Sequence, residues 1–366
     1  MKKNISVLAG DGIGPEVVQE GIKVLDTIAL KYGHEFILTH GDIGACSIEK
    51  TGTSLSDETV SLCKKSDAVI LGAIGDPKYD NNPASTVRPE QGLLKLRKEL
   101  GLYANIRPLK IYPSLSYLSP IKQKRLEGVD LVIYRELTGG IYFGEKKKTT
   151  DFSSDLCIYH RYEIERIARL AFQEAGRRKN KLCLVDKANV LESSRLWRSV
   201  VQDMEADFPM IDVEYMFIDN AAMQMILNPS RFDVIVTSNM FGDILSDEAS
   251  VLCGSIGLLP SSSIGTQSKM YEPVHGSYPQ AANKNVANPI AMILSVAMML
   301  EDFKLVDEAQ EVRSAVELCI HNGILSEELI EEKSYSCSDI GDIISYIVDA
   351  GESVLERYEN KQSSVI

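Results

Sequence analysis

Short apolar runs of strand length alternate with stretches of helical periodicity along most of this chain, and that alternation limits its possible folds. Strands are predicted at residues 5–9, 36–40, 68–71, 131–134, 181–185, 213–218 and 234–237. Helices are predicted at residues 16–31, 161–176, 192–205, 290–300 and 306–321. Such alternation is typical of an α/β protein with a largely parallel sheet, and we predict that fold class here.

Chain length and apolar patterning indicate the broad class of protein. With 366 residues the chain exceeds what one hydrophobic core usually supports, so two domains are expected. No stretch approaches the roughly 18 uncharged apolar residues of a membrane span. The first apolar run, residues 5–9, is too short for a signal-peptide core, so the predicted location is the cytoplasm.

Charge and cysteine content narrow the class further. The 52 acidic and 39 basic residues give a net charge of −13, which argues against a nucleic-acid partner. A small anionic substrate bound by local arginines remains compatible with this balance. The seven cysteines are odd in number and lack a C-x-x-C pair, so they predict reduced, mostly buried thiols without disulfides or a zinc site.

Two aspartates, Asp243 and Asp247, follow the apolar run at residues 232–236. If Ser238 or Asn239 caps a helix there, both side chains project from one face, one turn apart. In a cleft of effective dielectric near 20, carboxylates about 6 Å apart repel by roughly 2.8 kcal/mol. A divalent cation would turn this pair into a metal site, whereas a solvated acidic helix face is the alternative.

The glycine-rich segment at residues 9–16 follows a strand and opens a helix, with Pro15 suited to the first helical turn. The dinucleotide fingerprint G-x-G-x-x-G requires glycine where Pro15 stands, so a Rossmann fold is not expected. A loop against a ligand and a merely structural turn both remain open.

Several polar residues directly follow predicted strands, where open α/β sheets place their ligands. Arg135, Lys187 and Asp219 stand at such positions. Lys187 is a candidate base, and Tyr142 is either a proton donor or a packed aromatic. Arginines 88, 97 and 107 are candidates to converge on a carboxylate-rich ligand, although each alone is compatible with an ordinary surface position.

Two long segments, residues 75–90 and 257–288, are rich in Gly, Pro, Asn and Ser and are predicted as functional loops. The second contains His275, a candidate to stack on or hydrogen-bond a nucleotide, with a structural histidine as the alternative. Asn288 is a suitable N-cap for the next helix.

Five segments in order resemble the decarboxylating β-hydroxyacid dehydrogenases of the isocitrate/isopropylmalate dehydrogenase family, and within it the isopropylmalate enzymes most closely. The resemblance runs from Gly10 to about Leu300. The matching segments lie at residues 10–16, 135–144, 185–191, 239–247 and 272–277.

The resemblance implies an architecture. It implies two α/β domains with a long mixed, largely parallel sheet. The first, built from residues 1–102 and 254–366, would bind the cofactor; the second, residues 103–253, would carry the substrate and metal sites and the dimer interface. It also implies a homodimer whose subunits share active sites, acting on a small-molecule substrate, with neither a nucleic-acid nor a membrane partner.

The resemblance also implies catalytic roles. Asp243 and Asp247 would bind Mg²⁺ or Mn²⁺ together with Asp219 from the partner subunit. Lys187, also from the partner, would take the C2 hydroxyl proton while hydride leaves for NAD, and Tyr142 would protonate the enol carbon after CO₂ departs. Arg97, Arg107, Arg135 and Asp219 are the implied polar substrate-binding residues.

Substrate and cofactor choice are implied by further residues. Glu90, Leu93 and Leu94, with Val190 from the other subunit, match the apolar pocket of the isopropylmalate enzymes, which cannot satisfy a third buried carboxylate. The implied cofactor residues are Ile13, Glu90, Asn189, Gly257, Glu272, His275, Gly276, Ser277, Gln280 and Asn288. NAD-preferring members usually carry Asp where Gln280 stands, so NAD is expected with weakened discrimination against NADP.

The expected function is therefore oxidative decarboxylation of (2R,3S)-3-isopropylmalate in leucine biosynthesis. Tartrate, another alkylmalate or homoisocitrate is the alternative substrate, because one methylene contributes only about 1–3 kcal/mol to discrimination. A non-catalytic regulatory homologue is the alternative of another class. The metal and base residues that such chains typically lose are all present here.

Overall fold

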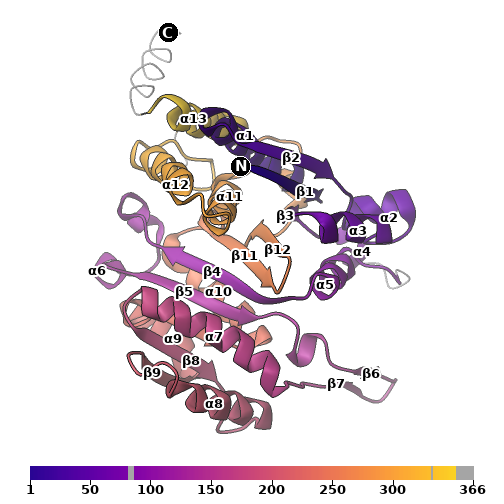
Figure 1. Cartoon of the computed structure of the whole chain (residues 1–366), viewed down its shortest axis with the longest axis vertical. Helices are drawn as coiled ribbons and strands as arrows, with labels where there is room; N and C mark the ends of the chain where they lie inside the picture. Colours follow the sequence, from indigo (N-terminus) through magenta and orange to yellow (C-terminus); the bar gives the residue numbers. More distant parts are fainter. Residues whose placement is uncertain (81–85, 331–332, 352–366) are drawn as a thin grey trace. The chain divides into compact units, whose positions relative to one another are not determined.

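The computed structural model describes residues 1–80, 86–330 and 333–351, and the chain divides into two compact units (Figure 1). Unit 1 comprises Met1–Leu100, Gly257–Ser262 and Ser268–Ile366, and unit 2 comprises Gly101–Ile256 and Ser263–Gln267. The strands form a large mixed, mostly parallel sheet, which confirms the predicted α/β class. The roles assigned to the two domains stay predictions.

The strands of unit 1 are arranged around its most apolar strand. Their order is β2 (Glu35–His40), β1 (Lys2–Gly10), β3 (Ala68–Ala73), β12 (Lys269–Pro273) and β11 (Pro260–Gly265), the last of which also supplies residues to unit 2. β1 pairs in parallel with β2 and β3, and β12 pairs in parallel with β3. Every residue of β3 is buried, as expected for a central strand of sequence AVILGA.

The helices of unit 1 come from both ends of the chain. They are α1 (Gly14–Tyr32), α2 (Ala45–Thr51), α3 (Asp57–Lys65), α4 (Pro77–Asp80), α5 (Pro89–Glu99), α11 (Ile290–Asp302), α12 (Val306–His321) and α13 (Cys337–Ala350). α1 begins with Pro15 in its first turn and ends at Gly33, whose φ of 68° closes the helix in the left-handed conformation. α13 packs on α1, and α12 packs on α11.

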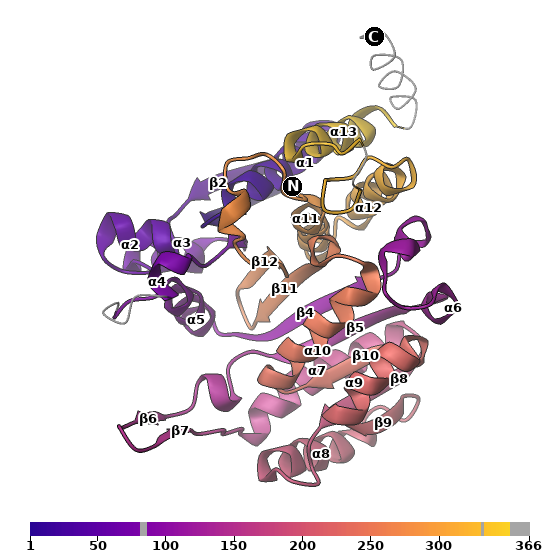
Figure 2. The ribbon, with the colours of Figure 1, turned by 180° about the vertical axis from the view of Figure 1, so that it is seen from behind.

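Unit 2 carries β4 (Leu102–Lys110), β5 (Asp130–Glu136), β10 (Val234–Thr237), β8 (Lys181–Asp186) and β9 (Asp212–Phe217), in that order. β4 runs antiparallel to β5, and the others pair in parallel. Helices α7 (Arg161–Arg177) and α8 (Glu192–Glu205) cover one face, while α9 (Ile218–Leu227) and α10 (Asn239–Ser250) lie on the other (Figures 1 and 2). The core between α7, α8 and the sheet contains Trp197 and Phe172.

The remaining elements of unit 2 are short. They are α6 (Gln123–Leu126), the hairpin of β6 (Lys146–Lys148) and β7 (Ser153–Asp155), and the 3₁₀ turns at Pro113–Leu118, Gly140–Tyr142, Pro229–Arg231 and Val251–Cys253. Two further 3₁₀ turns, Ile256–Leu258 and Pro279–Ala281, flank β11 and β12 in sequence. None of the helices described here is long and apolar enough to cross a membrane. Five of the seven cysteines are buried, which confirms the prediction that most of these thiols lie inside the fold.

The prediction of a loop at residues 257–288 was wrong, because β11 and β12 lie within it. Serine-rich composition suggested a loop, yet Ser261, Ser262 and Ser263 are buried strand residues. Their hydroxyls find partners inside the fold: Ser261 Oγ donates to the Glu272 carbonyl oxygen at 3.0 Å. Residues 81–85 of the other predicted loop lie outside the described residues.

β4 continues through Arg107 and Pro108 to Lys110 on an antiparallel ladder that tolerates this proline. Two local predictions need correction. Arg135 does not directly follow a strand, because β5 continues to Glu136. Asp219 lies in the first turn of α9 instead of at a strand end. The predicted helix start is confirmed, since Ser238 holds the N-cap position of α10, although its side chain makes no capping hydrogen bond.

Candidate active site

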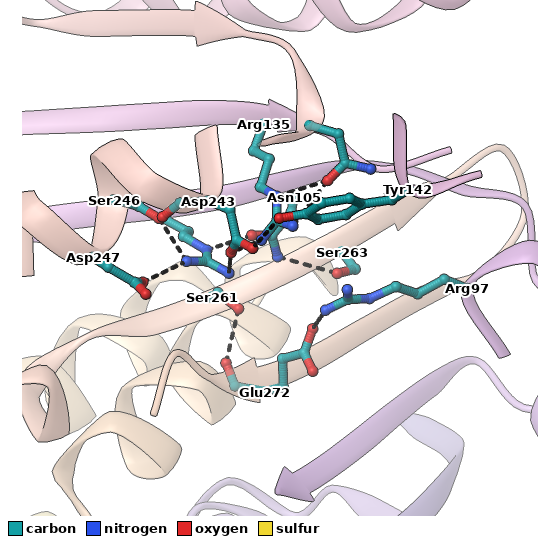
Figure 3. Close-up of polar contacts among 12 residues, drawn as sticks. Arg97, Asn105, Arg135, Tyr142, Asp243, Ser246, Asp247, Ser261, Ser263 and Glu272 are labelled. Carbon is teal, nitrogen blue, oxygen red and sulfur yellow. Dashed lines mark hydrogen bonds and ion pairs between the residues drawn. The ribbon is translucent and has the colours of Figure 1, made fainter. Parts of the chain in front are cut away.

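Asp243 lies at the centre of a polar cluster within unit 2 (Figure 3). Its Oδ1 accepts a hydrogen bond from Arg135 Nη1 and lies 3.7 Å from Arg107 Nη2. Its Oδ2 accepts a hydrogen bond from the Tyr142 hydroxyl at 3.0 Å. One carboxylate on α10 therefore contacts two cations and one phenol, supplied by β5, β4 and the 3₁₀ turn after β5.

Both arginines are fixed by neutral side chains as well as by acids. Arg135 is buried, and its Nε and Nη2 donate to Asn239 Oδ1 at 3.1 and 2.9 Å. Arg107 donates to Asn105 Oδ1 from Nε and to Ser246 Oγ from Nη1, each at 2.6 Å. Because these bonds use fixed groups, both guanidinium orientations are set without a ligand.

The Tyr142 hydroxyl donates a hydrogen bond to the Asp243 carboxylate. The Arg135 guanidinium carbon lies 5.8 Å from its ring centroid. Burial and the neighbouring Asp243 carboxylate raise the pKa of the Tyr142 hydroxyl above its ordinary value. The phenol therefore stays protonated at neutral pH and has a proton to give.

Asp247 lies one helical turn after Asp243, and Arg107 Nη1 reaches its Oδ1 at 3.4 Å. Its side chain is 61% exposed, so an oxygen remains accessible from solvent. Partial desolvation raises the pKa of the Asp247 carboxyl, with Asp243 adding to the effect. Carboxylate oxygens at this spacing suit Mg²⁺ or Mn²⁺, which prefer hard oxygen ligands.

The third predicted metal ligand, Asp219, is paired elsewhere. Its Oδ1 accepts from Lys187 Nζ at 2.5 Å, and this bond lowers the pKa of the Asp219 carboxyl. Among the described residues, no group of three or more His, Cys, Asp or Glu side chains is placed to bind a metal together. Within the described part of one chain, no third such side chain therefore joins Asp243 and Asp247.

Arg97 and Glu272 form a buried ion pair in unit 1 (Figure 3). Arg97 Nη2 on α5 donates to Glu272 Oε1 on β12 at 2.9 Å. Arg97 Nε is also buried and has no hydrogen-bond partner among the described residues. A buried guanidinium with a donor left over is suited to an anionic ligand.

The glycine-rich turn before α1 is closely packed in unit 1. The Ile13 amide donates to the Ser277 carbonyl oxygen at 2.8 Å, and a Cβ on Gly12 would lie 1.9 Å from that oxygen. A Cβ on Gly75 would lie 3.1 Å from Glu90 Oε1 and 3.3 Å from Ser277 Oγ. Three predicted cofactor residues, Ile13, Glu90 and Ser277, therefore lie around this turn.

Two further predicted cofactor residues carry buried polar atoms without partners among the described residues: His275 Nε2 and Asn288 Nδ2. His275 Nδ1 contacts the Gly276 carbonyl oxygen at 2.9 Å, and burial lowers the pKa of the His275 imidazole. A Cβ on Gly276 would meet nothing within 4 Å. The orphaned atoms and this open space fit a bound nucleotide.

The other predicted residues lie as follows. Leu93 and Leu94 are half-buried on α5, Asn189 and Val190 are exposed after β8, and Gln280 is exposed in the turn Pro279–Ala281. A Cβ on Gly257 would lie 3.0 Å from Asn288 Nδ2. Asn288 does not hold the N-cap position of α11, but its Oδ1 accepts from the Ile290 amide at 3.1 Å.

The residues that sequence reasoning missed are those that orient the arginines. Asn239, Asp243 and Ser246 recur at positions i, i+4 and i+7 of α10. That spacing marks one helix face and is the signal that could have found Asn239 and Ser246. Asn105 gave no such signal, because its role depends on its place beside Arg107 on β4.

Comparisons with known proteins place the sequence among related enzymes. Residues 4–344 match the family described as isocitrate/isopropylmalate dehydrogenase. The 3-isopropylmalate dehydrogenase of Bacteroides fragilis (strain YCH46) is 48% identical over 95% of this chain and 99% of its own length. That of Bacillus subtilis (strain 168) is 50% identical over 92% of this chain and 94% of its own.

Solved structures show the same fold. The isocitrate dehydrogenase of Methylococcus capsulatus superposes with a TM-score of 0.85 at 33% identity, covering 94% of this chain and 99% of that one. A beta-decarboxylating dehydrogenase from Thermococcus kodakarensis gives 0.77 at 33% identity, covering 94% and 96%.

Proposed function

This chain belongs to the isocitrate/isopropylmalate dehydrogenase family, and from that membership we propose that it catalyses a step of leucine biosynthesis. The reaction is the NAD-dependent oxidative decarboxylation of (2R,3S)-3-isopropylmalate to 4-methyl-2-oxopentanoate and CO₂. The observation that carries the proposal is the convergence of Arg107, Arg135 and Tyr142 on Asp243. Two guanidinium groups that can bind a carboxylate therefore lie beside a protonated phenol and an acid within unit 2.

The arginines supply substrate binding in this proposal. Arg107 and Arg135 are oriented before a ligand arrives, which suits bidentate contacts to a carboxylate. Arg97 adds a buried cation from α5. Half-buried Leu93 and Leu94 on the same helix support an alkyl substituent on the substrate and disfavour the third carboxylate of isocitrate.

Two residues move protons. Lys187 of a second copy accepts the C2 hydroxyl proton as the C–H bond at C2 breaks, and Tyr142 donates its proton to the enol carbon after CO₂ departs. The raised pKa of Tyr142 supports this direction of transfer, because the hydroxyl remains protonated until the enol forms.

The residues present fit both implied cofactors. Ile13, Ser277, His275 and Asn288 would hold NAD, and the acids Asp243 and Asp247 would hold Mg²⁺ or Mn²⁺ with Asp219 of a second copy. When bound, the nicotinamide supplies a hydride acceptor and the divalent cation polarises the forming ketone.

We propose a homodimer with shared sites for two reasons. Within one chain, no third acid joins Asp243 and Asp247 among the described residues. Exposed apolar side chains also line α9 and α10, including Met223, Ile226 and Ile244. Exposed apolar surface beside an incomplete site supports burial against a second copy.

A substrate panel tests the proposal. The purified chain is given 3-isopropylmalate, tartrate, another alkylmalate, homoisocitrate or isocitrate, with Mg²⁺ and either NAD or NADP, and NADH or NADPH formation is followed by absorbance. We expect the highest kcat/KM with 3-isopropylmalate and NAD. A higher kcat/KM with a shorter acid would refute the substrate, and a preference for NADP would refute the cofactor.

A further inference from the structure

Glu136 is a completely buried carboxylate at the end of β5, directly after Arg135. Neighbouring strand residues point to opposite faces, so Glu136 does not share the contacts of Arg135 with Asp243. A buried carboxylate is costly unless several donors satisfy it. The partners of Glu136 therefore indicate what this residue holds in place.

Those partners belong to the turn that leads to Tyr142. Glu136 Oε1 accepts from the Thr138 amide at 2.9 Å and from Thr138 Oγ1 at 2.7 Å. Glu136 Oε2 accepts from the Gly139 amide at 2.7 Å. Arg166 on α7 completes the set: its Nη2 lies 3.5 Å from Glu136 Oε1 and donates to Thr138 Oγ1.

Arg166 is itself held by aromatic rings. Its guanidinium carbon lies 4.5 Å from the Tyr103 ring centroid and 5.5 Å from that of Tyr162. Cation–π contacts of this kind restrict the direction of the guanidinium. Arg166 therefore braces the Glu136 carboxylate from α7.

The Thr138–Gly139 turn also contacts Asn239 and Tyr159. Asn239 Nδ2, at the start of α10, donates to the Gly139 carbonyl oxygen at 3.4 Å. A Cβ on Gly140 would lie 2.5 Å from the Tyr159 hydroxyl, whose oxygen accepts from the Asn239 amide at 2.9 Å. Gly140, with a φ of 75°, then opens the 3₁₀ turn that ends at Tyr142.

We propose that Glu136, braced by Arg166, is a positioning residue that fixes the Thr138–Gly139 turn and thereby sets the position of the Tyr142 hydroxyl for proton transfer. This inference rests on the proposed function for the role of Tyr142 as proton donor. In the step concerned, the Tyr142 O–H bond breaks and a C–H bond forms at the enol carbon. Glu136 itself exchanges no proton in this step.

The substitution Glu136→Gln separates charge from shape. Within the described part of the chain, every hydrogen-bond partner of the Glu136 side chain is a donor, and an ionised carboxylate accepts from these donors with both oxygens. A glutamine keeps one oxygen but sets an NH₂ group against either the Gly139 amide or the Thr138 donors. Two donors facing each other repel, so the turn must shift.

The first readout needs no substrate. A 3-fluorotyrosine is incorporated only at position 142, and its ¹⁹F resonance is recorded in the parent chain, in Glu136→Gln and in the control Glu165→Gln. Glu165 precedes Arg166 on α7, its side chain is 43% exposed, and Arg161 Nη1 lies 3.6 Å from its Oε1. We expect the resonance to move in Glu136→Gln and to stay in place in the control.

The second readout is kinetic. Because NADH forms before the enol is protonated, slow protonation gives a rapid burst of NADH followed by a slow steady rate. We expect Glu136→Gln to show such a burst with about a tenfold lower kcat and little change in the KM for 3-isopropylmalate, since small misplacements of reacting groups have effects of this order. A general loss of folding would lower burst and steady rate together.

An unmoved ¹⁹F resonance in Glu136→Gln would overturn the inference, and so would equal loss of burst and steady rate. If Glu136→Gln does not fold, Thr138→Val takes its place, because it removes one O–H donor and keeps the carboxylate; an unmoved resonance in this variant has the same meaning. A moved resonance in a chain inactive on every acid of the panel would leave the positioning intact and refute the proposed function alone.

Discussion

Two inactive variants are expected to restore each other's activity if the active sites are shared between subunits. The first variant, Asp243→Asn, removes the carboxylate that contacts both arginines and Tyr142. The second, Lys187→Gln, removes the candidate base, which lies beside Asp219 and outside the Asp243 cluster. Each alone should lower kcat by about 10²-fold or more, the usual effect of removing a group that stabilises the transition state.

The magnitude of the rescue follows from counting sites. In a mixed dimer, one site receives both substitutions and the other receives Asp243 from one chain and Lys187 from its partner, so one of two sites is intact. Random pairing of equal amounts makes half of the dimers mixed. The mixture should therefore recover about a quarter of the parent kcat, as two-fold symmetry requires.

The assay is steady-state NADH formation after the two chains are co-expressed with different tags, or unfolded and refolded together. Asp243→Asn mixed with Asp247→Asn is the matched control. Both residues lie on α10 of the same chain, so every site of that mixed dimer is damaged. Recovery of activity in the control would refute the shared site. So would a test mixture that shows no activity although mixed dimers have been isolated from it.

Three further predictions concern single positions. Tyr142→Phe should lower kcat by about 10²-fold or more with little change in substrate KM, as steady-state kinetics will show. Burial holds the pKa of His275 below 6.5, so the unfolded chain binds a proton that the native chain does not. The free energy of unfolding, measured with urea, should thus have its full value above a pH of about 6.5 and decrease as the pH falls below it. The substitution His275→Gln should make this decrease smaller. Gly12→Ala should lower the free energy of unfolding by about 3 kcal/mol or more, because its Cβ would lie 1.9 Å from a carbonyl oxygen at a φ of 59°. Gly33→Ala, with a φ of 68° and open space, should lower it by only about 1 kcal/mol.

The predictable part of the fold is the part where apolar periodicity decides the structure. Residues 192–205 and 306–321 were predicted as helices and are α8 and α12. The buried strand β3 is equally clear, because its residues are nearly all apolar. Ser261 to Ser263 were misassigned, since hydrogen bonds and not apolar side chains allow them to be buried.

Less of the site was predictable from the residues alone. Arg135 was recognisable because it follows an apolar run, near the strand end at which open sheets bind ligands. Glu136 stood beside it unnoticed, since a charged residue in a sequence does not show that it is buried. The pairing of Lys187 with Asp219 depends on how β8 and α9 pack, which neither residue's local sequence indicates.

The structure also changes the expected electrostatic balance of the Asp243–Asp247 pair. Repulsion between Asp243 and Asp247 suggested a missing cation, yet Arg107 contacts both acids and Arg135 contacts Asp243. The arginines thus offset the repulsion within the chain, and a metal must compete with them for Asp243. Substrate carboxylates would engage the same arginines and leave the acids to the metal, so metal and substrate should bind cooperatively.

Calorimetry should show Mn²⁺ binding about tenfold more tightly with 3-isopropylmalate present, a coupling in the usual range. Arg107→Met, which lacks one of the competing cations, should bind Mn²⁺ with less dependence on substrate. Equal Mn²⁺ affinity with and without substrate in the parent chain would show that the arginines do not compete with the metal.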